Sequence, residues 1–277
     1  MVMQNRRQFL LSSTVLGALA GSALRGRAAN AVHPAPLTLG VASYTFRKFT
    51  RAQALAFTRR LGIHQICFKS FHLPLDSSPK ECAAAAAEAK AAGITLWGGG
   101  VITLKTPGQV RQAFQYARAA GMRCIVGVPY PEVMDLVEQH IKTFDIAVAI
   151  HNHGPGDHLY PLPTDAYRRI QGRDPRLGLC VDIGHTVRAG GDLREQLRHC
   201  RDRLLDLHVK DVNEAGPRGH AVEVGRGVID IPAFLRTLRE IGYQHLLSFE
   251  YEPHPDDPLP GLAESVGYVR GVLATLA

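Results

Sequence analysis

Short apolar runs alternate with longer amphipathic stretches along the chain from Thr38 onward. Continuous apolar runs are typical of strands that are buried on both faces, as in parallel sheets. The stretches between them carry apolar residues at helical spacing, and glycines follow four of them, as at the carboxyl ends of helices. The predicted strands are Thr38–Phe46, Gln65–Ser70, Thr95–Val101, Arg123–Pro129, Ile146–His153, Leu177–Ile183, Leu204–Val212 and His245–Glu252. The predicted helices lie around 51–61, 79–92, 108–120, 132–143, 164–171, 192–200, 232–241 and 262–275.

This alternation predicts an α/β fold, a (β/α)8 TIM barrel in which a helix follows each strand. A doubly wound open sheet is the alternative. The region after the first predicted strand has no glycine-rich dinucleotide loop, which counts against the open sheet. No linker or shift of composition divides the region, so we expect residues 32–277 to form a single TIM-barrel domain.

The first 31 residues differ from the rest of the chain. They open with Asn5-Arg6-Arg7-Gln8-Phe9-Leu10-Leu11, and an apolar run of small residues extends from Val15 to Leu24. A charged start, an apolar centre and an alanine-rich end are the layout of an export signal, and the paired arginines resemble a twin-arginine signal. We therefore expect residues 1–31 to be a signal peptide read by the twin-arginine export machinery, and the mature protein to be periplasmic. An ordinary secretory signal or a retained anchor is the alternative. The apolar run is too short for a stable membrane span.

Composition and charge exclude several classes of protein. With 45% hydrophobic and 21% charged residues, the chain has an ordinary globular mixture and is not a disordered sequence. The whole chain has a net charge of +7, but four of these positive charges are arginines in the first 31 residues. The remaining 246 residues therefore carry a net charge of +3, and we expect no nucleic-acid partner. The five cysteines are odd in number and lack C-x-x-C spacing, which predicts buried thiols rather than disulfides or a zinc cluster.

Four consecutive predicted strands end in residues that bind metals, at the end of the barrel where active sites lie. His151 and Asp182 come from the fifth and sixth strands. His208 and Glu250 come from the seventh and eighth. Each of them alone is an ordinary polar group at a strand end. Two imidazoles and two carboxylates in equivalent positions predict a site for one divalent metal ion, with Mn, Fe, Co or Zn favoured over Ca or Mg.

The motifs around these positions resemble the sugar phosphate isomerase/epimerase family of the xylose-isomerase-like TIM-barrel superfamily. The resemblance spans about Thr38 to the carboxyl terminus and rests on Val181-Asp182-Ile183-Gly184-His185, Asp206-Leu207-His208-Val209-Lys210-Asp211, Glu223–Asp230 and Phe249-Glu250. It implies one divalent ion, Mn²⁺ first, with Zn²⁺, Fe²⁺ and Co²⁺ as alternatives, held by Glu, Asp, His and Glu. The last three ligands map onto Asp182, His208 and Glu250. At the first position the family has Glu-Asn-His, whereas this chain has His151-Asn152-His153.

The resemblance implies an enzyme that removes a proton next to a metal-bound carbonyl or hydroxyl of a sugar. We expect a sugar isomerase or epimerase with an unphosphorylated sugar as its small-molecule partner. The family's epimerases use two opposed glutamates, of which only Glu250 remains, so a lyase or dehydratase acting on keto-sugars or 3-keto-glycosides stays open. The candidate catalytic residues are Glu250, His185, His153 and Lys210. The candidate substrate contacts are Lys69, His72, Trp97, His185 and Arg226.

Two of these residues have a second possible role. Core packing is the alternative for Trp97, and Lys210 either stabilises an enolate oxygen or binds Asp182. Two different functions also stay open for the whole chain. A nuclease similar to endonuclease IV would need three metals and a more basic groove. A non-catalytic periplasmic sugar-binding module is the alternative of another class, with His151 marking a lost glutamate. Assembly into a homo-oligomer is left open.

Overall fold

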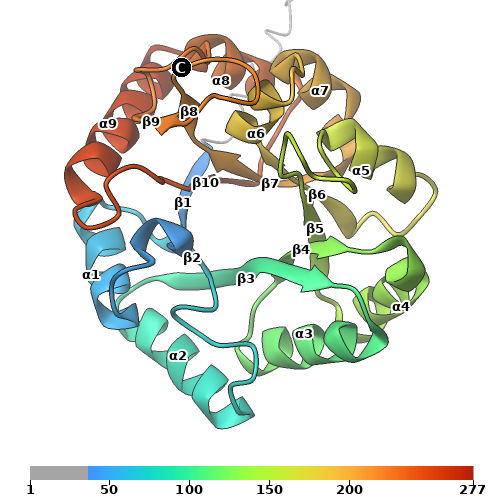
Figure 1. Cartoon of the computed structure of the whole chain (residues 1–277). Coiled ribbons are helices and arrows are strands. Elements are labelled where there is room, and N and C mark those ends of the chain that lie inside the picture. Colours follow the sequence, from blue (N-terminus) through green and yellow to red (C-terminus); the bar gives the residue numbers. More distant parts are fainter. Residues whose placement is uncertain (1–36, 277) are drawn as a thin grey trace, which may run out of the picture. The chain divides into compact units, whose positions relative to one another are not determined.

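The computed structural model describes residues 37–276. Eight parallel strands of this part close into a barrel with the hydrogen-bonded order β1-β10-β7-β6-β5-β4-β3-β2. Figure 1 looks onto the carboxyl ends of these strands, with the helices in a ring around them. The structure therefore confirms a single TIM-barrel domain. The predicted signal peptide lies outside the described residues, and its boundary at residue 31 stays a prediction.

The elements have the following bounds. The barrel strands are β1 (Thr38–Ala42), β2 (Gln65–Phe68), β3 (Thr95–Leu104), β4 (Cys124–Pro129), β5 (Ala147–His151), β6 (Leu177–Asp182), β7 (Leu204–Val209) and β10 (Leu246–Phe249). The helices are α1 (Arg51–Arg60), α2 (Pro79–Ala91), α3 (Pro107–Ala119), α4 (Met134–Phe144), α5 (Pro163–Ile170), α6 (Ile183–Arg188), α7 (Leu193–His199), α8 (Ile231–Glu240) and α9 (Leu259–Thr275). A short antiparallel pair, β8 (Asp211–Val212) and β9 (Ala221–Val222), lies outside the barrel. Single 3₁₀ turns span Ser43–Phe46, Pro131–Val133 and Arg201–Arg203.

Local sequence signals fix the starts of the first three helices. Thr50, Ser78 and Thr106 each accept a hydrogen bond from the backbone N–H three residues on. A Gln or Glu side chain at that third position accepts in return from the backbone of the capping residue. These capping boxes satisfy N–H groups that a helix start leaves unpaired. Each of these helices therefore begins at a defined residue, and this start sets where the preceding loop ends.

The first predicted strand ends at Ala42, and its last four residues, Ser43–Phe46, form a 3₁₀ turn. The structure differs from the predicted elements in two further places. A short helix, α6, begins directly at the end of β6 because Asp182 Oδ1 accepts a hydrogen bond from the N–H of His185 at 2.7 Å. The predicted seventh strand is divided, and its last two residues form β8. The apolar Ile183 continues the run of β6, and polar and apolar residues stay interspersed from β7 to Val212, so the pattern gave no sign that the backbone changes direction.

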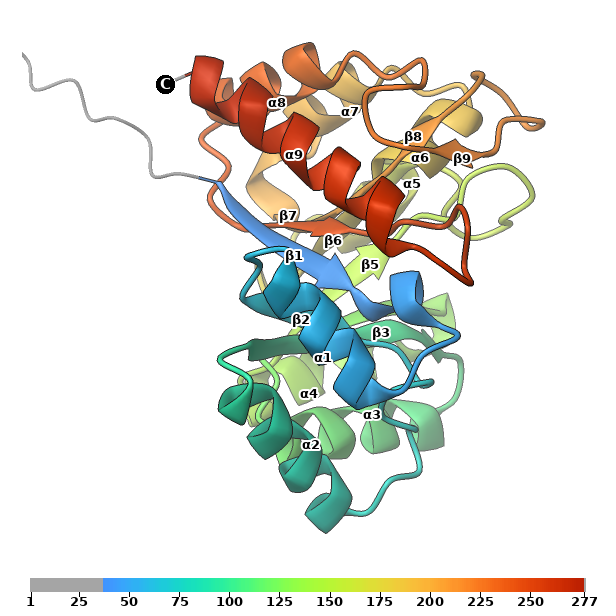
Figure 2. The same cartoon turned by 90° about the vertical axis from the view of Figure 1, so that its left-hand side faces the viewer.

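Figure 2 shows the strands pointing toward one end of the barrel, where the β8–β9 pair lies. All five cysteines are buried free thiols, as expected. Cys67, Cys124 and Cys180 pack together with Val126 and Ala149. No helix among residues 37–276 has the length and apolar character that crossing a membrane requires.

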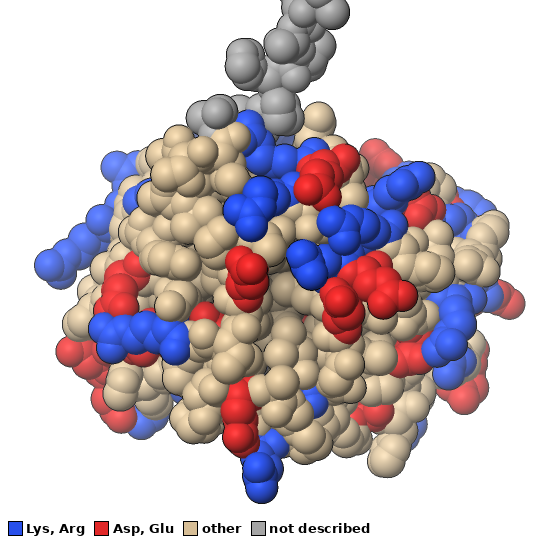
Figure 3. Space-filling model, turned by 90° about the horizontal axis from the view of Figure 1, so that it is seen from above, with Lys and Arg blue, Asp and Glu red and all other residues tan. Residues whose placement is uncertain are grey.

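The outer surface carries charges of both signs. Figure 3 shows one face of the molecule, on which Lys and Arg side chains lie beside Asp and Glu side chains. Among the described residues, Arg198 of α7 pairs with Glu240 of α8 at 2.9 Å, with both side chains exposed. This face therefore offers no continuous basic stripe of the kind that follows a phosphate backbone.

Candidate active site

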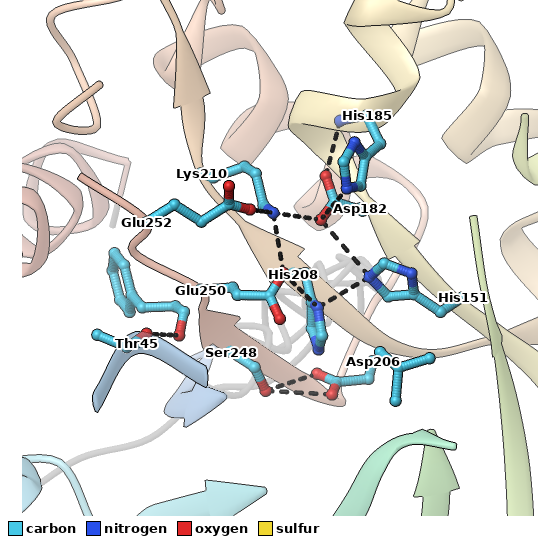
Figure 4. Close-up of polar contacts among 12 residues, drawn as sticks. Thr45, His151, Asp182, His185, Asp206, His208, Lys210, Ser248, Glu250 and Glu252 are labelled. Carbon is cyan, nitrogen blue, oxygen red and sulfur yellow. Dashed lines mark hydrogen bonds and ion pairs between the residues drawn. The ribbon is translucent and has the colours of Figure 1, made fainter. Parts of the chain in front are cut away.

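Four polar side chains converge at the carboxyl ends of four neighbouring strands (Figure 4). His151 ends β5 and Asp182 ends β6. His208 lies one residue before the end of β7, and Glu250 directly follows β10. All four are buried, and one potential ligand atom of each lies within 4.8 Å of the others. The strands are adjacent in the closed sheet, and this adjacency brings together residues that are far apart in the chain.

The distances among these atoms fit a shared cation. His151 Nε2 lies 3.0 Å from His208 Nδ1 and 3.5 Å from Asp182 Oδ2. His208 Nδ1 lies 3.3 Å from Glu250 Oε2. Two ligand atoms about 2.1 Å from one ion, at tetrahedral or octahedral angles, are themselves about 3.0–3.4 Å apart. Asp182 Oδ2 is buried, and no contact that it makes with the described residues has the geometry of a hydrogen bond, as expected for an oxygen that faces cations.

A lysine ammonium contacts the same two carboxylate oxygens. Lys210 Nζ lies 2.9 Å from Asp182 Oδ2 and 2.8 Å from Glu250 Oε2, and it also contacts Glu252. Burial by itself disfavours the charged lysine, but the three carboxylates outweigh burial and raise the pKa of Lys210 well above its usual value. Lys210 is therefore a fixed positive charge and not a proton carrier. Of the two roles expected for it, binding Asp182 is the one that the structure displays.

These charges set the protonation of the site at neutral pH. Burial favours the neutral form of Glu250, yet Lys210 and His208 hold its pKa well below the usual range. Asp182 has a lowered pKa as well, because His185 and Lys210 outweigh its burial. Burial lowers the pKa of His151 to about 3. The site thus offers two ionised carboxylates and a neutral imidazole, which are the forms that bind a divalent cation.

His208 differs from His151 in its charge environment. Burial disfavours the imidazolium, but the neighbouring Glu250 outweighs this effect and raises the pKa of His208. The layer below contains Asp206, whose carboxylate accepts hydrogen bonds of 2.8 and 3.1 Å from the Ser248 hydroxyl. Burial raises the pKa of Asp206 to about 7. Figure 4 shows this pair beneath His208, as alternation along β7 and β10 requires.

Glu250 divides its two carboxylate oxygens between different surroundings. Oε2 accepts the hydrogen bond from Lys210 and faces His208. Oε1 has no hydrogen-bond partner among the described residues. The hydroxyl of Thr45 donates to Phe249 O at 3.3 Å and accepts from Tyr251 N at 2.9 Å, so it fixes the backbone on both sides of Glu250. Sequence reasoning missed Thr45, because it lies about 200 positions away in the chain.

Asn152 is a second residue that sequence reasoning did not select. It is buried, and its Oδ1 accepts a hydrogen bond from Asp182 N at 2.9 Å. Its Nδ2 donates to Thr186 Oγ1 at 3.2 Å, and that hydroxyl donates to Asp182 O at 2.6 Å. Asn152 therefore ties the end of β5 to the end of β6. Its position in the sequence, between the candidate residues His151 and His153, could have identified it as a neighbour of the site.

Three further predicted residues surround the cluster. The ring of His153 lies 4.5 Å from that of His151, and the His185 ring lies 6.0 Å from both. Burial lowers the pKa of His153, which keeps this half-buried imidazole neutral at pH 7. Lys69, at the end of β2, donates from Nζ to Val101 O at 2.7 Å. Burial lowers the pKa of Lys69, and the charge of Glu250 opposes this shift. The barrel mouth thus has the imidazoles of His153 and His185 near β5 and β6, and the half-buried ammonium of Lys69 near β2.

The structure does not bring the other three predicted substrate contacts to this cluster. His72 is buried, and its ring nitrogens face the Ser43 hydroxyl at 2.8 Å and Phe49 O at 3.2 Å. Arg226 pairs with Glu264 of α9, and both side chains are exposed. Trp97 lies near the start of β3, at the opposite mouth of the barrel. A strand start is at the wrong end for the carboxyl-end site, so the expected stacking of Trp97 on a sugar there needs correction.

One aspartate anchors the loop that follows β7. Asp211 is buried, and its carboxylate accepts four hydrogen bonds, from the N–H groups of Val212, Gly225, Gly227 and Ile229. A Cβ atom on Gly227 would lie 2.2 Å from Asp211 Oδ1, so only glycine fits there. These contacts give a physical reason for the Glu223–Asp230 motif.

The chain is similar in sequence to a known family and to a curated protein. A family model described as xylose isomerase-like TIM barrel matches residues 35–272. The rhizopine catabolism protein MocC of Rhizobium meliloti is 26% identical over 153 residues, which are 50% of this chain and 46% of that protein. The chain therefore aligns with about half the length of this curated relative.

Two solved structures share the barrel at low sequence identity. L-ribulose 3-epimerase is 18% identical with a TM-score of 0.71, covering 86% of this chain and 95% of that one. The 3-keto-D-glucoside 4-epimerase from E. coli is 16% identical with a TM-score of 0.69, covering 85% and 99%. At these identities the likeness establishes the fold and leaves the reaction to the site itself.

Proposed function

Because the chain belongs to the xylose isomerase-like TIM barrel family, we propose that it is a divalent-metal-dependent sugar isomerase or epimerase. The observation that carries this proposal is the convergence of His151, Asp182, His208 and Glu250. Mn²⁺ is our first choice of ion, with Zn²⁺, Fe²⁺ and Co²⁺ as alternatives. The two epimerases of the same fold agree with this reaction class.

The proposed reaction moves a proton on a carbon next to a sugar carbonyl or hydroxyl. A bound divalent ion supplies Lewis-acid stabilisation for the negative charge that develops on the sugar oxygens. Glu250 accepts the proton at Oε1, while its Oε2 stays paired with Lys210. His185 returns a proton from the side of β6, and the neutral His153 lies beside it. Asp182 and Lys210 hold their charges throughout and keep the electrostatic environment constant.

The asymmetry of these proton carriers favours a second candidate reaction. Glu250 is the carboxylate with a free oxygen, and the groups on the other side are the imidazoles of His153 and His185. An imidazolium is a good proton donor to a departing hydroxyl or alkoxyl group. A lyase or dehydratase acting on a keto-sugar or 3-keto-glycoside is therefore the alternative. The reaction products distinguish the two, since elimination gives an unsaturated product and isomerisation does not.

We also propose that the enzyme works in the periplasm after twin-arginine export, on an unphosphorylated sugar. The support is the sequence of residues 5–11 and the short apolar run behind it.

The first test is the metal content per chain, measured by mass spectrometry on protein purified without chelators. We expect about one ion per chain in the wild type and a much lower content in His151→Ala, which removes one ligand. His158→Ala is the matched control, because His158 lies exposed in the loop after β5. A wild type without metal would contradict the proposal and favour a non-catalytic sugar-binding module.

The second test is turnover by Glu250→Gln, with a panel of unphosphorylated sugars and 3-keto-glycosides as substrates. We expect loss of activity without loss of the fold, because glutamine keeps the shape of glutamate but takes up no proton at the amide oxygen. Circular dichroism and the thermal midpoint verify the fold. Retained activity would remove Glu250 from the mechanism.

A further inference from the structure

A cavity lies at the opposite mouth of the barrel. It has a volume of about 380 Å³ and is lined by residues at the amino ends of the strands. These strand ends are on the left in Figure 2. Thr38 and Thr95 line it as the first residues of β1 and β3. Arg123 lines it directly before β4, and His245 directly before β10. Trp97 of β3 also lines it, which gives this tryptophan a place outside the carboxyl-end site.

The lining combines an aromatic face with a cation and neutral polar groups. The Trp97 side chain is half-buried. Among residues 37–276, no Asp or Glu lines the cavity. Arg123 is exposed and, among the described residues, has no carboxylate within ion-pair distance. The remaining polar lining consists of threonine hydroxyls, glutamine amides and the His245 imidazole. Burial lowers the pKa of His245, so Arg123 is the positive charge of the cavity at neutral pH.

We propose that this cavity is a second binding site, for a single sugar ring that carries one anionic group. The indole of Trp97 offers an apolar surface for the C–H face of the ring. The hydroxyl and amide groups bind ring hydroxyls, and the Arg123 guanidinium pairs with the anionic group. A volume of about 380 Å³ falls in the usual range for small-molecule sites. A sugar carboxylate and a sugar phosphate share this chemistry.

This site is separate from the proposed reaction centre. Glu250 and the other converging residues lie at the carboxyl ends of the strands, and the cavity lies at the amino ends. The barrel interior between the two ends is packed with buried side chains that include Cys67, Cys124 and Cys180. A ligand in the cavity therefore does not touch the reacting atoms, and its binding stands or falls independently of the proposed reaction.

The chain offers a direct reporter for this cavity, because Trp97 is its single tryptophan. Its fluorescence is recorded during titrations with glucuronate, glucose 6-phosphate and glucose, with calorimetry as a second readout for a ligand that leaves the emission unchanged. We expect saturable binding of at least one of the two anions. Glucose, which lacks the charge, should bind about tenfold more weakly. The anion that binds identifies whether the site takes a carboxylate or a phosphate.

Three variants separate this site from its surroundings. Arg123→Gln should weaken anion binding about tenfold, because it removes the charge but keeps a polar side chain. Arg111→Gln is the matched control, since Arg111 is exposed on α3 and does not line the cavity. Glu250→Gln should bind the anion as the wild type does. No binding by either readout, equal affinity in Arg123→Gln, equal affinity for glucose, or loss of binding in Glu250→Gln would each overturn the proposal.

Discussion

The substitution Lys210→Met removes the positive charge from the carboxylate cluster and nearly keeps the length of the side chain. In the wild type, the buried ammonium lies 2.9 Å from Asp182 and 2.8 Å from Glu250. Removing one partner of a buried ion pair leaves an uncompensated charge and costs about 3–5 kcal/mol. Whole domains are stable by about 5–15 kcal/mol, so the variant should fold with a large loss of stability.

The loss should depend on pH in a definite direction. The pKa values of Asp182 and Glu250 are lowered in the folded protein. A lowered pKa contributes stability above the unfolded value of about 4, and this contribution disappears as the pH falls through the folded pKa. Without Lys210, both carboxylates take up protons at higher pH, which neutralises the uncompensated charge. The difference between wild type and variant should be largest near pH 7–8 and decrease toward pH 5.

Urea unfolding at several pH values between 5 and 8, in the presence of a chelator, measures this difference. Lys142→Met is the matched control, because Lys142 forms an exposed pair with Glu138 at 2.8 Å. Such a pair is worth about 0–1 kcal/mol. A loss below about 1 kcal/mol for Lys210→Met at pH 7, or a loss that does not change with pH, would refute the electrostatic account of the site.

Two further predictions concern the loop after β7 and the surface. Gly227→Ala should lower the free energy of unfolding in urea by about 1–3 kcal/mol, because the new Cβ would lie 2.2 Å from Asp211 Oδ1. Gly271→Ala in α9 is the control: its Cβ meets no atom within 4 Å, and it should raise the free energy of unfolding by about 0.5–1 kcal/mol. A Gly227→Ala variant as stable as the wild type would contradict the anchoring role of Asp211. Arg226→Gln should leave kcat and KM unchanged in steady-state assays, since Arg226 pairs with Glu264 on the surface. A large rise in KM would return Arg226 to the site.

The barrel was predictable because most strand residues are buried on both faces and several helices have their own start and end signals. The strand periodicity does not record where the backbone turns. The turn into α6 depends on the hydrogen bond from His185 N to the Asp182 carboxylate, and the β8–β9 pair depends on contacts between segments ten residues apart. Both depend on contacts that exist only in the folded chain, so the hydrophobic pattern of the sequence does not indicate them.

The metal-binding candidates were predictable because barrel geometry collects the residues at strand ends. The same reasoning places Trp97 at the other mouth, since it lies near the start of its strand. Its position within the strand would have excluded it from the carboxyl-end site. His72 and Arg226 are a different case. Their side chains are occupied by Phe49 and Glu264, and no local pattern indicates which distant partner a polar group will find.

The converging cluster lies in one half of the barrel. β5, β6, β7 and β10 are consecutive in the closed sheet and supply every residue of the converging cluster. The predicted site residues that follow β2 are Lys69, whose charge interacts with that of Glu250, and His72, which bonds Ser43 and Phe49 instead. Under the proposed function, reaction and recognition can therefore evolve as separate modules. A mutant library confined to the loops after β3 and β4, which leaves Thr45 and Lys69 unchanged, can explore new substrates while the converging cluster stays in place.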